Sequence, residues 1–275
     1  IVAYAGYDAH GNKLDGPTSF EDFFSERDEN GNLKRQIDAF RPIYIAGYIQ
    51  DKFQFNDLVF NVGVRVDRFD ANQQVLVDQY SLFPTISAQE MLQEGALGVD
   101  ALPQNIGDDY VVYVNDLTEP TRVVGYRDGN QWFDADGNQI ADPISIAQST
   151  TTGRITPYLE DPDNTNLSTD LTAESFEDYT PQVNVMPRIS FNFPISDQAL
   201  FFAHYDILTQ RPNSFIRFDP TDYLYLEANQ GNVLNNPDLR PERTIDYEVG
   251  FKQTLSKRSA ITLSAFYREL RDMIQ

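Results

Sequence analysis

Six stretches of the chain alternate between apolar and polar residues, and each keeps its apolar residues at positions of one parity. In residues 58–69 the even positions from Leu58 to Val66 are apolar, whereas Arg65 and Asp67 stand at odd positions. Successive side chains of a strand point to opposite faces, so the pattern predicts strands with one apolar and one polar face. The strands are expected at residues 42–55, 57–70, 185–194, 198–208, 243–254 and 260–270.

The connections between these strands alternate between short and long. Short connections are expected at Asn56-Asp57, 194–198 and 256–259, and long ones at 71–184 and 209–242. If neighbouring strands are antiparallel, all the tight turns lie at one end of the sheet and all the long loops at the other. Transmembrane barrels have this asymmetry, whereas a soluble sandwich has turns at both ends.

The fifth strand is preceded by a segment that cannot join a sheet early. Pro237 and Pro241 lack a backbone N–H and hold the residues before them in extended geometry. Ladder pairing is therefore expected to start only after Glu242. A slip of one residue would turn Asp246 and Glu248 towards the apolar side, so the start of the strand fixes its register.

The long connections contain signals for structure of their own. Thr18 with Glu21, and Ser87 with Glu90, have the spacing of a helix capping box. Short helices are therefore expected at 18–24 and 87–95. An Asp three residues before Gly-Asn recurs in three segments and predicts tight hairpin turns. These segments are residues 7–14, 27–33 and 133–140.

Composition narrows the class of protein. The chain has 275 residues, 42 acidic against 21 basic side chains, a net charge of −21 and no cysteine. Residues 71–184 hold 19 of the acids and three arginines, a net of −16. Such a charge repels phosphate, so nucleic acid is not an expected partner, and thiolate chemistry is excluded. The chain starts at Ile1 without a signal-peptide pattern, and we expect it to be a piece of a longer protein.

No motif of a catalytic site is found, and we expect no enzyme activity. Asp134, Asp136 and Asn138 imitate the start of a calcium-binding loop, but Gly137 is one position early and no Glu closes the loop. A hairpin turn is the favoured interpretation. Residues 160–170 could gather a cation or form a solvated loop, and the latter is favoured. No tightly held cofactor is expected, and loosely bound Ca²⁺ on the acidic loops is left open.

Three segments together resemble TonB-dependent outer-membrane receptors. "NPDLRPERTIDYEVGF" at 236–251, followed by "ITLSAFYRELRDMI", is similar to the family's Asn-Pro-x-Leu-x-Pro-Glu segment and the next two strands. "IAGYIQDKFQFNDLVFNVGVRVDRFD" at 45–70 resembles an earlier hairpin, and "PRISFNFPISDQALFFAHYDILTQRP" at 187–212 a later one. "GPTSFEDFF" at 16–24 and the Asp-Gly-Asn turns resemble the Oar-like branch common in Bacteroidota.

The resemblance implies an all-β fold, an antiparallel meander that forms part of a transmembrane barrel of about 22 strands. It implies hairpins at 42–70, 185–208 and 243–275, and extracellular loops at 1–41, 71–184 and 209–242 that contain short helices and hairpins. The implied location is the outer membrane of a Gram-negative bacterium. The implied partners are membrane lipid and lipopolysaccharide, the plug domain and other barrel strands, TonB, and a surface lipoprotein.

The implied function is active uptake of a large nutrient: an oligosaccharide, a peptide or a chelated metal. Residues on the polar parity would face the water-filled interior, where they contact the plug or line the substrate path, or simply keep a wet wall polar. His204 is expected to face this interior rather than a metal. The fourth strand alternates least clearly, because Leu200 and Phe202 share the parity of His204. The expected interior residues are Gln50, Arg65, Asp67, Arg188, His204, Asp206, Asp246 and Glu248.

A second class of function stays open from the residues alone. A soluble or surface-attached β-sandwich, acting as an adhesin or binding module, would also hide one apolar face. Aromatic residues in the longest connection could stack on a sugar or peptide, or build a small core within the loop. These residues are Tyr80, Tyr110, Tyr113, Tyr126, Trp132 and Phe133.

Overall fold

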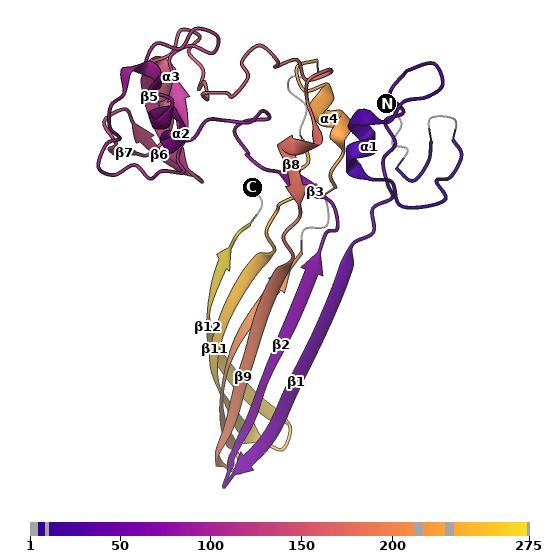
Figure 1. The fold of residues 1–275 in the computed structure, drawn as a ribbon. Coiled ribbons are helices and arrows are strands. Elements are labelled where there is room, and N and C mark those ends of the chain that lie inside the picture. The colour runs from indigo at the N-terminus through magenta and orange to yellow at the C-terminus, as the bar shows by residue number, and fades with distance from the viewer. Residues whose placement is uncertain (1–4, 9–10, 212–216, 229–233, 274–275) are drawn as a thin grey trace.

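The computed structural model of the protein describes residues 5–8, 11–211, 217–228 and 234–273. Its main feature is a long, curved antiparallel sheet whose six strands pair strictly in chain order (Figure 1). This order confirms the predicted meander, and β1 and β12 are the two open edges of the sheet. The strands are β1 (Ile43–Phe55), β2 (Leu58–Asp70), β9 (Gln182–Ser196), β10 (Ala199–Gln210), β11 (Glu242–Ser256) and β12 (Ser259–Arg271).

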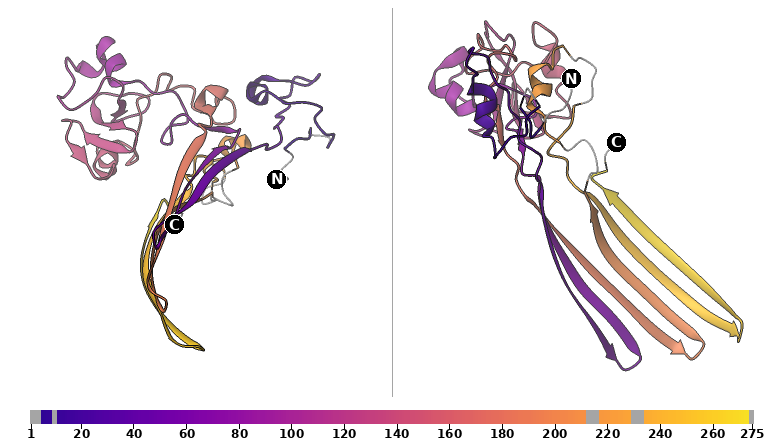
Figure 2. Two further views of the ribbon diagram at one scale, coloured as in Figure 1. Left: turned by 90° about the horizontal axis from the view of Figure 1, so that it is seen from below. Right: turned by 90° about the vertical axis from the view of Figure 1, so that its right-hand side faces the viewer.

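All three hairpin turns lie at one end of this sheet, and the long connections lie at the other (Figure 2). The turns are Asn56-Asp57, Asp197-Gln198 and Lys257-Arg258. The second turn is shorter than the expected 194–198, because β9 continues through Pro194 to Ser196. Pro194 fits there because the register shifts next to it, between Ala199 and Leu200 of β10. The predicted asymmetry of short and long connections is confirmed.

The proline-guarded start of β11 is also as expected. The strand begins at Glu242, directly after Pro241, and its first partner is Gln210. From there the pairing with β10 continues without interruption to Gln253 opposite Ala199. Pairing begins at Glu242 itself rather than after it, because the residue that follows a proline keeps its own N–H and can join the ladder.

The register places the predicted apolar and polar sets on opposite faces of the sheet. Val62 stands opposite Ile189, and Val249 opposite Ala203, because directly paired residues of antiparallel strands share a face. The apolar face is open: Leu263 is 73% exposed and Ile49 72%. Ile245, which lies on the same face and opposite Ile207 and Glu269, is an exception because it is buried.

The longest connection contains a folded unit, which we call the loop unit (residues 85–160; Figure 1). A four-stranded sheet of short strands carries a core in which Val112, Tyr113 and Val114 are completely buried. Burial raises the pKa of the Tyr113 hydroxyl to about 12, although Arg127 donates a hydrogen bond to it. The elements are α2 (Ala88–Gln93), η1 (Ala96–Gly98), β4 (Val111–Val114), β5 (Val123–Asp128), β6 (Gln131–Asp134), β7 (Gln139–Ile140) and α3 (Ile144–Gln148).

The aromatic residues of this connection mostly build that core. Tyr113, Tyr126, Trp132 and Phe133 are buried, whereas Tyr80 is 37% exposed and packs edge-on against Trp132 with ring centroids 5.1 Å apart. Of the two interpretations that the sequence left open, the small core is therefore confirmed for these four residues.

A second cluster joins the loops above the sheet, and we call it the rim cluster. Its buried aromatic residues, Phe23, Phe176, Phe218 and Tyr223, come from three different connections of the chain. The elements around it are α1 (Phe20–Ser25), β3 (Gln74–Leu76), η2 (Ala173–Ser175), β8 (Phe176–Asp178) and α4 (Pro220–Leu224). Because they share one core, the three loops form a single structure at the end of the barrel strands.

The helix signals are confirmed at one position and shifted at the other. Ser87 caps α2, and its hydroxyl accepts the backbone N–H of Glu90. The cap of α1 is Ser19 rather than Thr18, and the Asp22 carboxylate, not Glu21, accepts the Ser19 N–H at 3.3 Å. The helix starts one residue later than expected because a second hydroxyl residue follows Thr18.

Two of the three Asp-x-x-Gly-Asn segments, 27–33 and 133–140, form the predicted tight turns, whereas residues 9 and 10 of the segment 7–14 lie outside the described residues. Asp134 is typical: its carboxylate accepts the Asn138 backbone N–H at 2.8 Å, and Gly137 has φ of +84°. The same arrangement holds Asp28 to Asn32. Because the Asp134 carboxylate accepts hydrogen bonds from backbone N–H groups of its own turn, the hairpin interpretation of residues 133–140 is confirmed.

Within the part of the chain described, no helix is long and apolar enough to span a membrane.

Candidate functional site

The candidate site is the polar face of the six-stranded sheet. Pairing across the strands aligns one row of residues over its whole width: Gln50, Gly63, Arg188, Asp206, Asp246 and Arg268, one from each strand. Four of the eight residues predicted from the sequence stand in this row, and His204, Glu248 and Arg65 stand in the polar rows next to it. The row therefore brings together side chains that lie up to 218 positions apart in the chain.

Two acids at the centre of this row are each held by an arginine. The Arg188 Nε lies 3.0 Å from an Asp206 carboxylate oxygen, and the Arg268 Nη2 lies 2.6 Å from Asp246. Asp206 and Asp246 themselves stand directly opposite each other, where like charges repel. The flanking guanidinium groups offset this repulsion, so the row reads plus, minus, minus, plus across four strands.

Asp246 keeps one unused acceptor. Its Oδ1 is buried, and no donor reaches it in the described residues, while Oδ2 takes both contacts from Arg268. A buried carboxylate oxygen without a donor carries a desolvation cost. This atom is therefore a natural acceptor for a group that comes from outside the described chain.

The neighbouring row carries a weaker pair. His204 Nδ1 lies 3.5 Å from the Glu248 carboxylate, and the two residues are directly opposite in the register. Ser190 follows on the other side of His204. His204 thus lies among polar residues of the sheet face, and no group of three or more metal-binding side chains occurs in the described ranges.

A third cluster lies nearer the loop end. Arg65 Nε donates to the Asp67 carboxylate at 2.7 Å, and Arg65 Nη2 donates to the Tyr44 hydroxyl at 2.9 Å. The Tyr44 hydroxyl also donates to Asp67, which is 9% exposed. The Arg211 guanidinium lies over the Tyr44 ring, 4.4 Å from its centroid. This arrangement holds the Arg65 guanidinium in place at the upper part of the polar face.

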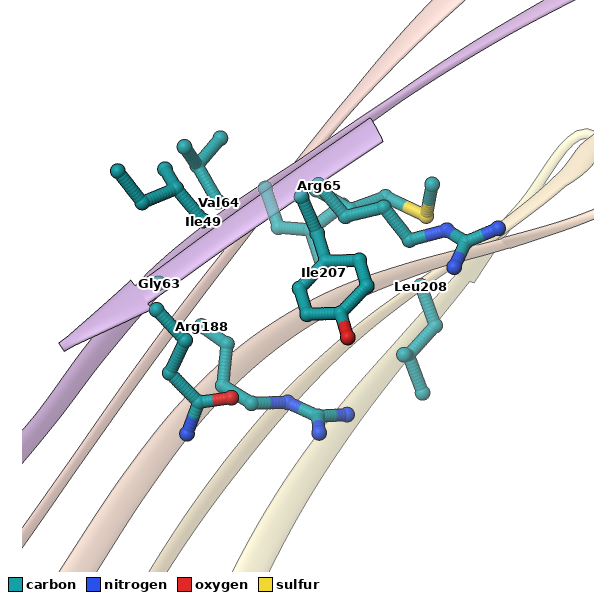
Figure 3. Close-up of a pocket in the computed structure, with 10 residues that line it drawn as sticks. Ile49, Gly63, Val64, Arg65, Arg188, Ile207 and Leu208 are labelled. Carbon is teal, nitrogen blue, oxygen red and sulfur yellow. The ribbon is translucent and has the colours of Figure 1, made fainter. Parts of the chain in front are cut away.

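Between these clusters the polar face has a hollow of about 330 Å³. Arg65, Arg188 and Gln50 line it, whereas Ile49 and Val64 point to the other side of the strands (Figure 3). Gly63 is part of the wall, and a Cβ there would press against strand β1, 3.1 Å from the Ile49 carbonyl oxygen. Among the described residues Gln50 has no ion-pair partner, and it lines the hollow.

The structure adds three polar-face residues that sequence reasoning had not selected: Tyr44, Arg211 and Arg268. Tyr44 and Arg268 had the correct parity, so alternation carried the signal. Their importance comes from cross-strand partners, which depend on register and not on composition. Arg211 lies one residue beyond β10, where no alternation rule applies.

The polar face has no arrangement of nucleophile, base and oxyanion donors among the described residues that would support catalysis. It offers a half-exposed wall of ion pairs, with charges of both signs, on one face of a sheet whose other face is apolar. Such a wall can hold a polar molecule or a polar protein surface by exchanging one set of hydrogen bonds for another.

Comparisons with known proteins identify what the chain is similar to. A family model described as "TonB dependent receptor-like, beta-barrel" matches residues 2–275. Among solved structures, the chain is similar to Fiu, the ferric-catecholate import receptor of Escherichia coli K12, in its closed form. The identity is 14% and the TM-score 0.34, over 83% of this chain and 21% of the Fiu chain. No curated protein matches the chain. The chain thus spans about a fifth of the length of that structure.

Proposed function

The chain belongs to the family of TonB-dependent receptor β-barrels, and from this premise we propose that it is the barrel portion of an active transporter for a large nutrient. Receptors of this family are outer-membrane proteins with a plug domain, and they interact with TonB. The observation that carries the proposal is the contrast between the two faces of one sheet: exposed aliphatic residues on one side and rows of ion pairs on the other.

Strand length and facing fit a lipid environment. The strands have 12 to 15 residues, and a tilted strand of about 9–11 residues crosses the hydrocarbon core. Lipid outside and water inside explain why Leu263 and Ile49 are open while Asp206 and Asp246 are paired. A β-sandwich would place a second sheet on the apolar face, and the other described sheets belong to the loops instead.

The predicted interior residues would act in this barrel as the wall that meets the plug or the passing nutrient. Arg65, Arg188 and Gln50 border the hollow, and Asp246 presents an unused oxygen. Asp67 and Asp206 would hold Arg65 and Arg188 in place through their ion pairs. His204 and Glu248 would add a polar pair to the same wall. The row of paired charges suits a plug surface that carries hydrogen-bonding groups of both kinds.

Orientation follows from the family. The hairpin turns would face the periplasm and the loop unit and rim cluster the outside, where lipopolysaccharide and a surface lipoprotein are candidate neighbours. "GPTSFEDFF" and the three Asp-x-x-Gly-Asn turns favour the Oar-like branch of Bacteroidota. Ca²⁺ bound loosely by the acidic loops would relieve the repulsion within residues 71–184, which carry −16.

The experiment uses the complete receptor in a strain that lacks its own copy. Growth is compared on oligosaccharides, peptides and chelated iron, with wild-type receptor or with a variant that lacks the TonB-binding segment. We expect growth on one nutrient class to require both the receptor and TonB. Equal growth of all strains on every nutrient contradicts transport. In parallel, Ser264→Cys should react with a water-soluble maleimide in vesicles, whereas Val249→Cys should stay protected by lipid.

A further inference from the structure

A second hollow lies above the sheet, and we call it the rim pocket. Its volume is about 330 Å³, and four segments line it: 17–23, 36–41, 72–74 and 217–220. Two of them lie directly above the β1–β2 hairpin, since β1 begins at Ile43 and β2 ends at Asp70. The other two belong to α1 and to the start of α4, which lie above the sheet (Figure 1). The pocket is therefore at the mouth of the barrel.

Contacts between the loops build this pocket without a ligand. The rings of Phe20 and Phe218 meet edge to face with centroids 5.6 Å apart. The Phe218 backbone N–H donates to the Gln73 side chain at 2.9 Å, and the Asn72 side chain donates to the Arg41 carbonyl at 3.1 Å. Three connections are thus tied together around the hollow. A pocket of about 300–1,000 Å³ with a few converging polar groups is the usual form of a ligand site.

The walls of the pocket differ in chemistry. One side is apolar, with Phe20, Ile37 and Phe218 from three segments. The other carries side-chain amides, which can pair with peptide N–H and C=O groups. They include Gln36 and Gln74; the Gln74 amide N–H donates to Asp178 at 2.5 Å, and its carbonyl oxygen can accept a peptide N–H. A branched or aromatic side chain fits the apolar wall without leaving polar groups unpaired. A sugar ring can also stack on aromatic side chains, so the choice of a peptide rests on the arginine of the pocket and not on this wall.

Two arginines line the pocket, and they are in different states. Arg41 is paired with Asp38 at 3.1 Å. Arg217 is half-buried, and in the residues that the structure describes its guanidinium has no hydrogen-bond or ion-pair partner. Arg217 thus differs from Arg41 in that no acid of the described chain neutralises its charge within the pocket. A guanidinium binds a carboxylate with two parallel hydrogen bonds, which makes a carboxylate its natural ligand.

We propose that the rim pocket binds the C-terminal end of a short peptide. The terminal carboxylate pairs with Arg217, the last side chain packs on the wall formed by Phe20 and Phe218, and the backbone pairs with the amides of Gln36 and Gln74. This inference rests on the proposed transport function and deepens it, because it names a peptide as the nutrient that is first captured at the mouth of the barrel.

The test measures binding to the complete, purified receptor in detergent, without TonB. The probe is the peptide Gly-Gly-Ala-Leu with fluorescein at its N-terminus, either with a free C-terminus or amidated, followed by fluorescence anisotropy. We expect the free acid to bind about tenfold more tightly than the amide, the range set by a charge-assisted hydrogen bond. Arg217→Ala should remove this difference, whereas Arg154→Ala, an exposed arginine of the loop unit, should leave it unchanged.

The outcomes separate this inference from transport itself. Equal binding of the two probes, absence of binding by both, or displacement of the free acid by a trimer of galacturonic acid in an Arg217-dependent manner overturns the peptide proposal. Transport is then still tested by the dependence of growth on TonB. Conversely, Arg217-dependent binding together with TonB-independent growth contradicts transport but supports peptide binding in the rim pocket. Heat-modified electrophoretic mobility confirms that each variant retains a folded barrel.

Discussion

The six-stranded sheet and the loop unit follow opposite rules of burial within one chain. In the sheet, Leu263 and Ile49 are more than two-thirds exposed, and charged residues pair on the opposite face. In the loop unit, Val112 and Val114 are fully buried and the acids lie outside. One polypeptide with two such regions meets two different surroundings, which is what a barrel wall with an aqueous loop domain requires.

Trp132→Ala is expected to cause the largest loss of stability, and the loss should be confined to the loop unit. The indole is 4% exposed and packs against Tyr113 and Tyr80 with centroids 5.1 Å away in both cases. Removing such a side chain costs about 3–5 kcal/mol of unfolding free energy. Hydrogen exchange of the complete receptor should show β4–β6 losing protection while β11 and β12 keep theirs. Ile144→Ala, on an exposed residue of the same unit, serves as control.

If the sheet loses protection together with the loop unit after Trp132→Ala, the two regions are one cooperative structure and the comparison fails. Arg127 makes this a demanding test, because it joins the unit to the segment that leaves the sheet. Its guanidinium pairs with the Asp78 carboxylate and lies 4.7 Å from the Tyr80 ring centroid.

Val249→Arg tests the other region, where the apolar face should meet lipid. Val249 is at the middle of β11 and 49% exposed. An arginine there costs about 2–4 kcal/mol at the bilayer midplane. Urea titration of the receptor folded into vesicles should show this loss, whereas Ser264→Arg, on the polar face in β12, should cost far less. Equal losses from the two substitutions would mean that both faces meet the same solvent.

The sequence was sufficient to predict the sheet because a strand with different solvents on its two faces imposes a strict alternation. Parity alone separated Arg188 and Asp246 from Ile189 and Val249, and the register agrees with that separation. Parity did not indicate that Asp206 faces Asp246, or that Arg268 completes the row. Those neighbours follow from the register between strands, which the turns set and the alternation leaves free.

The alternation of apolar and polar residues could not predict the loop unit or the rim cluster. Strands such as β4 and β7 have four and two residues, too few for a period to be recognised. The rim cluster unites Phe23, Phe176 and Phe218, which lie in three different connections. For the aromatic residues of 71–184 the sequence left a small core open as one of two interpretations. It did predict the cap of α2 at Ser87, because a capping signal is local.

Gly250→Ala tests how tightly side chains pack on the polar face. A Cβ at this position would lie 2.1 Å from the Phe202 ring, which crosses over the glycine from the neighbouring strand. We expect a loss of about 1–3 kcal/mol from this overpacking, measured by urea titration. The loss should largely disappear in a Phe202→Ala background. Gly47→Ala in β1, where a Cβ meets nothing within 4 Å, is the matched control.

This substitution also explains why the fourth strand alternates least clearly. Phe202 shares the polar face with His204, and its ring takes the space that Gly250 leaves open. An apolar side chain on the wet face is thus a packing partner of a glycine rather than an error in the register. If Gly250→Ala costs the same with and without Phe202, this account is wrong.

The smallest predicted effect concerns pH and belongs to the loop unit alone. The Ser87 backbone N–H and hydroxyl donate to the Glu90 carboxylate at 2.8 and 2.7 Å and lower its pKa below the ordinary 4.5. A lowered pKa in the folded state means that the stabilisation is present above pH 4.5 and is lost as the pH falls through the folded value. Glu90 is exposed, so the contribution is small.

Ser87→Ala should remove this pH dependence together with the helix cap, at a cost of about 1 kcal/mol to α2. Protection factors of the α2 amides, corrected for intrinsic exchange, should fall between pH 5 and pH 3 (roughly the range of carboxylate titration) in the wild type. In Glu90→Gln they should stay constant, because the amide does not titrate and the Ser87 hydroxyl still caps the helix. The amides of β10 and β11 belong to the sheet and not to the loop unit, so their protection factors serve as the internal reference in each sample. Wild-type and Glu90→Gln profiles that fall in parallel would assign the acid sensitivity to other carboxylates of the loop unit.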